Sequence, residues 1–145
     1  MRAKLLESAG GLRKFVVALE AGEEAVATLK TFAEAEGLSG SSLSAIGAFE
    51  RASLGWFNPA TKEFRQNEIT DQAEVLSLLG NVARSLEGEV KLHIHAVLGC
   101  GDASTRGGHL VAGWVRPTLE VMVEESPTHL QRAPDPRSGL VLLQP

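Results

Sequence analysis

Three of the four histidines of this chain, His93, His95 and His109, lie close together in the sequence. His93 and His95 belong to a stretch, residues 90–99, in which apolar residues alternate with other types. Residues two apart on a β-strand project from the same face, so both imidazoles share one face while the apolar face anchors the strand on a core. A loop rich in glycine and polar residues follows, and His109 then opens a second alternating run. If the two runs pair as a hairpin, three imidazoles converge and could hold a transition metal with one position left open.

The spacing of these histidines is also compatible with solvated side chains on a polar strand face, because histidine has many structural uses. His129 lies among proline and polar residues and is expected in a loop outside the site. Cys100 is the single cysteine, so the chain has no internal disulfide, which agrees with a reducing compartment. It is close enough in sequence to be a further ligand, although a lone cysteine in a loop more often has no such role.

The length and composition predict one globular domain. A chain of 145 residues with 43% hydrophobic and 22% charged residues can build a core of ordinary size. No apolar run reaches the length that spans a bilayer, and residues 1–9 contain too short an apolar segment for a secretory signal. We therefore expect a cytoplasmic protein without a membrane partner.

The net charge of −4 and the isoelectric point of about 5.6 argue against a general DNA-binding protein. Neutralisation of phosphates supplies much of the affinity for nucleic acid, and it normally requires lysine and arginine gathered on one surface. Here the basic residues are scattered along the chain without a run. The composition leaves open a local basic patch made by folding or assembly.

Hydrophobic periodicity predicts one helix among several strands. The helix covers residues 23–36, with acidic residues at its start, an apolar stripe along it and Gly37 at its end. The predicted strands cover residues 12–19, 45–57, 63–69, 73–84, 90–99, 109–115, 118–125 and 139–143. The stretch 73–84 also allows a short helix, and residues 126–138 are expected to be irregular. These elements predict an α+β fold built on a mainly antiparallel sheet, as a single domain over residues 1–145 with a core of about 12–125 and an irregular tail over 126–145.

Five motifs follow one another in a defined order. They are Ala45-Ile-Gly-Ala-Phe49, Leu54-Gly-Trp-Phe57, Glu74-Val-Leu-Ser-Leu-Leu-Gly-Asn81, His93-Ile-His-Ala-Val-Leu-Gly99 and Gly107-Gly-His-Leu110. Together they resemble the PPC domain, the plants-and-prokaryotes-conserved domain, over residues 15–125. The two motifs that contain the histidines are the most specific part. The resemblance implies a PPC-like fold in a small stand-alone prokaryotic protein; such members are homotrimers, and some carry a metal at the three histidines.

The plant members join this domain to AT-hook motifs that bind the DNA minor groove, and no Arg-Gly-Arg-Pro sequence occurs here. Their pattern Gly-Arg-Phe-Glu-Ile-Leu-Ser-Leu corresponds to Asp71-Gln-Ala-Glu-Val-Leu-Ser-Leu78. The glutamate is kept as Glu74, but the Gly-Arg-Phe start is not. A DNA-binding label therefore comes to this chain by family analogy alone.

The favoured interpretation is a metal-binding homotrimer of undefined biochemical activity. His93, His95 and His109 are the expected ligands of a divalent transition metal, zinc above all. Asp102 and Glu74 are candidates for contacts that orient a ligand or a bound water. For Asp102 the sequence favours a turn residue, because aspartate is frequent in turns.

The alternative is a metal-dependent enzyme, hydrolase-like or cupin-like, in which the same histidine site polarises a substrate or generates hydroxide. Glu68, Glu74 and Asp102 are available as bases, but no spacing selects one. A cupin usually has a glutamate a few residues after its histidine pair, where this chain has Val97-Leu-Gly-Cys100. A small-molecule ligand is compatible with either function.

The predicted strands carry apolar residues on both faces, as in residues 15–19 and 76–79. One amphipathic helix covers only one face of a sheet, so the other face needs a partner or a sheet that closes on itself. The resemblance to the PPC domain implies that the partner copies form a homotrimer. We expect trimer contacts near residues 54–57 and 75–79, with each metal site close to a subunit boundary.

Overall fold

The computed structural model describes residues 1–144 and contains one helix and nine strands in this part of the chain. In chain order they are β1 (Arg2–Ala9), β2 (Leu12–Glu20), α1 (Ala25–Ala35), β3 (Ser41–Asn58), β4 (Glu63–Ile69), β5 (Ala73–Ser85), β6 (Val90–Gly99), β7 (Thr105–Glu125), β8 (Gln131–Pro134) and β9 (Val141–Gln144). The predicted α+β class, with one principal helix and a mainly antiparallel sheet, is confirmed. The stretch that also allowed a short helix is strand β5. No helix in the described residues is long and apolar enough to cross a membrane.

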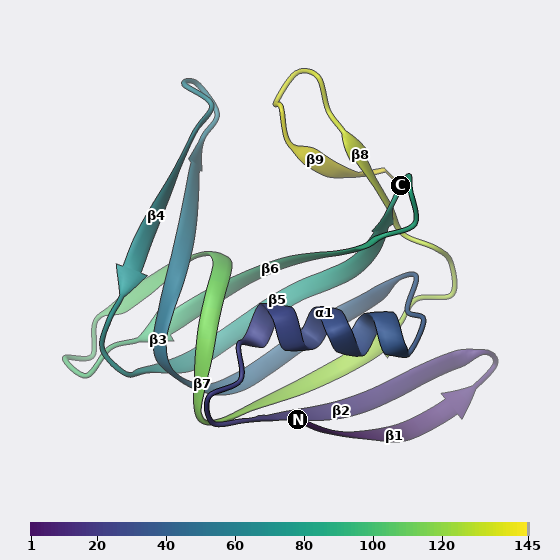
Figure 1. Cartoon of the computed structure of the whole chain (residues 1–145), viewed down its shortest axis with the longest axis horizontal. Coiled ribbons are helices and arrows are strands. Elements are labelled where there is room, and N and C mark those ends of the chain that lie inside the picture. Colours follow the sequence, from purple (N-terminus) through teal and green to yellow (C-terminus); the bar gives the residue numbers. More distant parts are fainter. Residues whose placement is uncertain (145) are drawn as a thin grey trace.

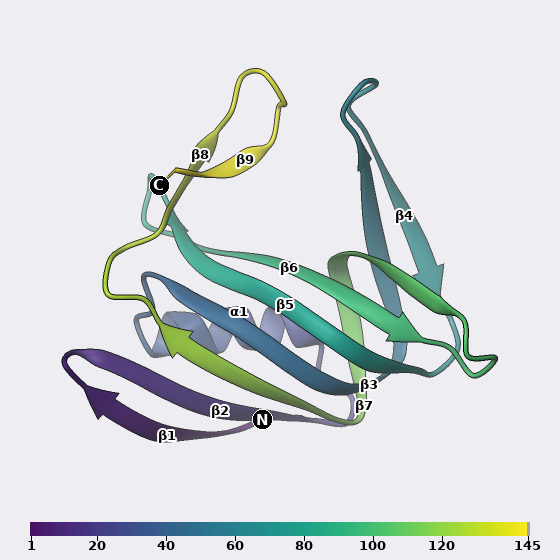
Figure 2. The same ribbon diagram turned by 180° about the vertical axis from the view of Figure 1, so that it is seen from behind.

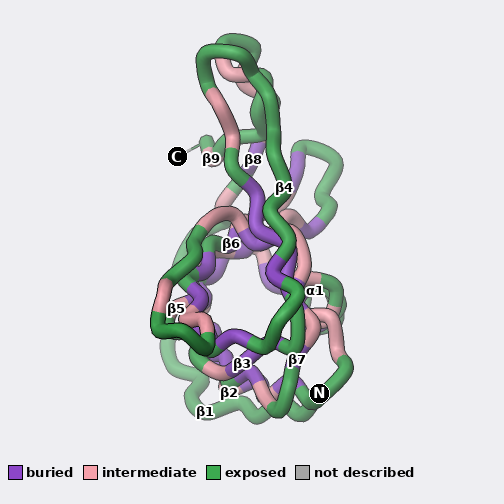
Figure 3. The backbone as a smooth tube through the Cα atoms, turned by 90° about the vertical axis from the view of Figure 1, so that its left-hand side faces the viewer, coloured by how far each residue is buried: buried purple, intermediate pink, exposed green. Residues whose placement is uncertain are grey.

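The centre of the fold is a closed circuit of four strands. β3 pairs with β5, β5 with β6, β6 with β7, and β7 with β3. The backbone trace in Figure 3 shows these strands curving around the core, with α1 on one side. β2 and β1 extend the sheet beyond β7, and β4 forms a projecting hairpin with the second half of β3 (Figure 1). Within the described residues only β8 pairs in parallel, with the end of β5.

Helix α1 covers one face of the curved sheet, and the opposite face is open to view in Figure 2. The Glu24 carboxylate caps the helix by accepting from the backbone N–H groups of Val26 and Ala27. The buried side of the helix packs on the sheet, and Phe32 meets Phe15 of β2 edge to face with ring centroids 5.4 Å apart. The apolar face of β6 lies in this same core, so the helix holds the strand that carries two of the histidines.

The region around Arg116 and Pro117 differs from the sequence expectation. Periodicity predicts two separate strands there, over 109–115 and 118–125, whereas the structure has the single long strand β7. The peptide bond between the two residues is cis. Both lie where the β3–β7 ladder shifts register, between its pairs at Val115 and Leu119. Because Pro117 has no N–H to donate, a ladder irregularity accommodates it without ending the strand.

Two strands have no counterpart in the sequence expectations. Every residue of β1 is exposed, its sequence shows no apolar alternation that would indicate a strand, and it pairs with β2. The sequence predicts an irregular segment over 126–138, but β8 lies in it and forms a hairpin with β9. Strand β3 also begins at Ser41, earlier than the predicted residue 45, because Ser41 pairs with both β5 and β7. The buried apolar residues run from Phe15 to Val123.

Candidate metal centre

Strand β6 presents His93 and His95 on the outer face of the sheet. Their neighbours Ile94 and Ala96 point the other way and are each 2% exposed, which fixes the orientation of the strand. A slip of one residue would move the apolar set out of the core, so burial sets the face on which the imidazoles stand. The predicted alternation of this strand is confirmed.

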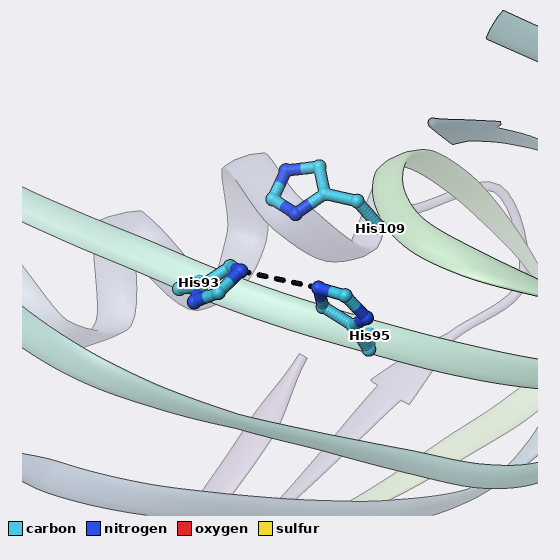
Figure 4. A group of neighbouring side chains, drawn as sticks. All are labelled: His93, His95 and His109. Atoms are coloured by element: carbon cyan, nitrogen blue, oxygen red, sulfur yellow. Dashed lines mark hydrogen bonds between the residues drawn. The ribbon is translucent and has the colours of Figure 1, made fainter. Parts of the chain in front are cut away.

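His109 joins the pair from β7. It lies directly opposite His95 in the antiparallel register, and Gly108 lies opposite Ala96. A Cβ added to Gly108 would come 2.6 Å from the carbonyl oxygen of Gly55 on β3, so the close approach of β7 to β3 requires glycine here. The predicted hairpin register, which brings the third histidine beside the other two, is therefore found (Figure 4).

The three imidazoles have the spacing of a metal site. One ring nitrogen from each of His93, His95 and His109 lies within 4.8 Å of the others, and the Nε2 atoms of His93 and His95 are 3.1 Å apart. Zinc–nitrogen distances of about 2.0–2.1 Å with tetrahedral angles place ligand nitrogens about 3.3 Å apart. The donor set of three neutral nitrogens fits zinc, copper or nickel, and small rotations of the rings close the remaining difference.

The electrostatic surroundings keep two of these histidines neutral. The pKa of His93 is lowered to about 4 by burial, with further lowering by the charge of Arg132 and by His95 and His109. The pKa of His109 is also lowered, mainly by burial and then by His95 and Arg132. A neutral imidazole keeps one ring nitrogen with a free lone pair, the form that binds a metal.

Three side chains near the cluster were not expected from the sequence. Phe64 of β4 lies against Gly55, and its ring stands edge to face with that of His109 at a centroid distance of 6.3 Å. Arg132 of β8 donates from Nη2 to the side-chain oxygen of Asn81 at 2.8 Å. Asn81 on β5 lies directly opposite His93. The alternation of residues 63–69 could have indicated Phe64, but the sequence near Arg132 carries no signal that it docks beside β5.

The other predicted site residues lie away from the histidines. Asp102 accepts hydrogen bonds from the backbone N–H and the hydroxyl of Ser104, at 2.9 and 2.6 Å, as a turn residue does. Glu74 pairs with Gly99, four residues or about 13 Å along β6 from His95. Neither forms a hydrogen bond with a histidine among the described residues. Within this part of the chain, the cluster therefore brings together the three imidazoles without a carboxylate.

The remaining candidates are also separate from the cluster. The carboxylate of Glu68 accepts from the Ser53 hydroxyl at 2.8 Å. Cys100 lines a hollow together with Asp102 and Glu68. His129 is exposed in the segment between β7 and β8, outside any strand.

Comparison with known proteins gives a consistent result. The family model described as the Plants and Prokaryotes Conserved (PCC) domain matches residues 6–127. A structure from Archaeoglobus fulgidus, described as a metal-containing protein, is 34% identical, covers 91% of this chain and 93% of its own, and has a TM-score of 0.84. A "putative dna binding protein" from Bacteroides thetaiotaomicron is 29% identical over 98% and 96% of the two chains, with a TM-score of 0.88. A plant- and prokaryote-conserved (PPC) protein from Pyrococcus horikoshii is 29% identical over 96% and 98%, with a TM-score of 0.85. The comparison with curated proteins gave no match.

Proposed function

The chain belongs to the Plants and Prokaryotes Conserved (PCC) domain family, and from this premise we propose that it is a metal-binding homotrimer whose ligands are His93, His95 and His109. The single observation that carries the proposal is the convergence of three ring nitrogens within 4.8 Å on one face of the sheet. His93 and His109 are half-buried, so a chance cluster would place two imidazoles beside a third in a partly desolvated position with no ion to bind. The similar protein from Archaeoglobus fulgidus is described as metal-containing, which supports the same assignment.

Zinc is the metal that we propose, because it is bound by three histidines with a fourth position open to water or a ligand. A metal held by the three histidines would act as a Lewis acid and would lower the pKa of the water bound to it. The chain itself contributes the rigid strands that hold the imidazoles, the aromatic ring of Phe64 beside His109, and the positive charge of Arg132. A metal-dependent enzyme remains the alternative, with the same three ligands.

The trimer is supported by apolar side chains on the histidine face. Leu79 lies directly opposite His95 and is 61% exposed, and Leu76 is 53% exposed. Trp56 on the projecting β3–β4 hairpin is also 52% exposed, but it points away from the histidine face, because its neighbour Gly55 is the residue that pairs with His109. A protomer that leaves such side chains in water gains by burying them against a second copy. Because Leu79 and His95 share a face, burial of this surface would place each metal site close to a subunit boundary.

One similar protein is described as a putative DNA-binding protein. We still expect no general DNA binding by this chain, because the chain's net charge of −4 gives no general attraction to phosphate. The single cysteine agrees with a reducing compartment, and we propose a cytoplasmic location.

Elemental analysis tests the proposal directly. The protein should be purified without an affinity tag, stripped with a chelator and reloaded with zinc. We expect close to one metal per chain before stripping and after reloading. Substoichiometric metal under both conditions would overturn the proposed function.

A further inference from the structure

Arg132 stands on the same side of the sheet as the histidines. β8 runs parallel to the end of β5, with Arg132 paired to Ser85. The guanidinium reaches back along β5 to Asn81, whose side-chain oxygen accepts from Nη2 at 2.8 Å. Asn81 and His93 are directly opposed on neighbouring strands, so their side chains project from the same face. The guanidinium is therefore held beside the metal ligands by a neutral amide.

Within residues 1–144, the positive charge of Arg132 has no anionic partner. The residue is only 6% exposed, its two hydrogen bonds go to the neutral oxygens of Asn81 and Val141, and its Nε is buried without an acceptor. Among residues 1–144 no carboxylate oxygen lies within 4 Å of it. Arg13, by contrast, is paired with both Glu36 and Glu125. A buried cation without a counter-charge is costly, so the position of Arg132 calls for an anion that the described residues do not provide.

A bound metal would add to this unbalanced charge. Three neutral imidazoles leave a divalent ion with its full charge, and Arg132 adds one more positive charge. We propose that the centre binds a small oxyanion, a carboxylate or a phosphate group, with one oxygen at the open position of the metal and with its charge balanced by Arg132. This inference rests on the proposed metal site and adds the chemical class of its ligand.

A purely structural role for Arg132 leads to a different expectation. The bonds to Asn81 and Val141 anchor the β8–β9 hairpin to the sheet, and both acceptors are neutral oxygens. An anchor needs no charge. If Arg132 were only an anchor, replacing its charge would leave the affinity of the metal centre for anions unchanged.

The test uses the full chain loaded with cobalt(II), whose visible absorption reports a change of ligand at the open position. Acetate and inorganic phosphate are titrated separately into wild type, Arg132→Gln and the control Arg137→Gln, whose side chain is 95% exposed. We expect saturable spectral changes in wild type and Arg137→Gln with at least one of the two anions. Arg132→Gln should need at least tenfold more of that anion for half-saturation. The anion that responds identifies the group as carboxylate or phosphate.

Two results would overturn the inference: equal half-saturation in Arg132→Gln and wild type, or no spectral response to either anion in wild type that binds one cobalt. A wild type that binds no stoichiometric cobalt would instead refute the metal site itself. If Arg132→Gln does not fold, Asn81→Asp carries the test, because it gives Arg132 a resident carboxylate. That variant should also lose the response, and an unchanged response in it would count against the proposal.

Discussion

His95 on β6 lies directly opposite His109 on β7, with the two ring centroids 5.6 Å apart. This cross-strand pair joins two segments that are separated in sequence by the loop between the strands. Its geometry follows from the register of the ladder, since directly opposed side chains on an antiparallel pair share a face. The site is therefore only as stable as that register.

The first prediction concerns the ligands. Replacing His93, His95 or His109 singly by alanine should lower the bound zinc well below one equivalent, because each removes one of three nitrogen donors. His129→Ala should keep its zinc, since His129 is exposed away from the cluster. Metal content is measured by elemental analysis after dialysis. Equal metal in wild type and the triple variant would contradict the ligand assignment.

The second prediction concerns the strand beneath the site. A Cβ added to Gly80 on β5 would lie 2.4 Å from the carbonyl oxygen of His93, which is backbone and cannot rotate away. Gly80→Ala should therefore destabilise the fold by about 1–3 kcal/mol, as overpacking does. Gly101→Ala is the matched control, because nothing lies within 4 Å of a Cβ there. Urea unfolding measures both variants, and equal midpoints would contradict the close approach of β5 and β6 at Gly80.

The third prediction concerns pH. Arg13 donates from Nε and Nη2 to the two oxygens of Glu125, at 2.8 and 2.7 Å, and this hydrogen bonding lowers the pKa of Glu125. A lowered pKa means that the ionised carboxylate stabilises the fold above the unfolded value of about 4.3. That contribution is lost as the pH falls through the folded-state pKa.

The unfolding free energy of wild type should therefore fall more steeply between about pH 5 and pH 3 than that of Glu125→Gln. Glu120→Gln on the same strand, an exposed residue, serves as the control and should follow wild type. Parallel curves for wild type and Glu125→Gln would show that this contact adds nothing to stability.

The fourth prediction concerns assembly. Light scattering at low concentration should give the mass of a trimer for wild type. Leu76→Glu should reduce that mass, because it places a charge on an apolar residue of the expected contact surface. Leu6→Glu on β1, at a similarly exposed leucine, should leave the mass unchanged. A stable wild-type monomer would refute the assembly, and a dimer would refute only the number three.

The fifth prediction concerns nucleic acid. At physiological salt the protein should not bind generic duplex DNA tightly, because its net charge is −4 and it contains no AT-hook. Fluorescence anisotropy with a labelled duplex measures this. Sub-micromolar binding that weakens with salt would show that folding or assembly creates a basic surface that the composition does not indicate.

The parts of the site that the sequence predicts are those that local periodicity encodes. The alternation around His93 and His95 specifies both a strand and the face of the imidazoles, since burial of Ile94 and Ala96 admits one orientation. The position of His109 follows from the hairpin.

The position of Arg132 cannot be predicted from local periodicity. It reaches the site because the short strand β8 docks beside the end of β5, a contact between segments far apart in the chain. The hydrophobic periodicity of strands and helices, two and 3.6 residues, carries no information about such a contact. The same limit applies to β1, whose exposed residues carry no pattern, and to Pro117, whose effect depends on the neighbouring ladder.

The β6–β7 ladder begins at His95, which gives the three ligands unequal backbone support. His95 is flanked by β5 and β7, and His109 by β6 and β3, whereas His93 is paired only with β5. Two ligands are thus fixed before a metal arrives, and the third stands on a strand with one open edge. Exchange of the proposed ion would then require rotation of the His93 imidazole rather than separation of strands. We therefore expect the proposed centre to load and release a metal while the sheet stays folded, unlike a zinc finger, which folds only around its ion.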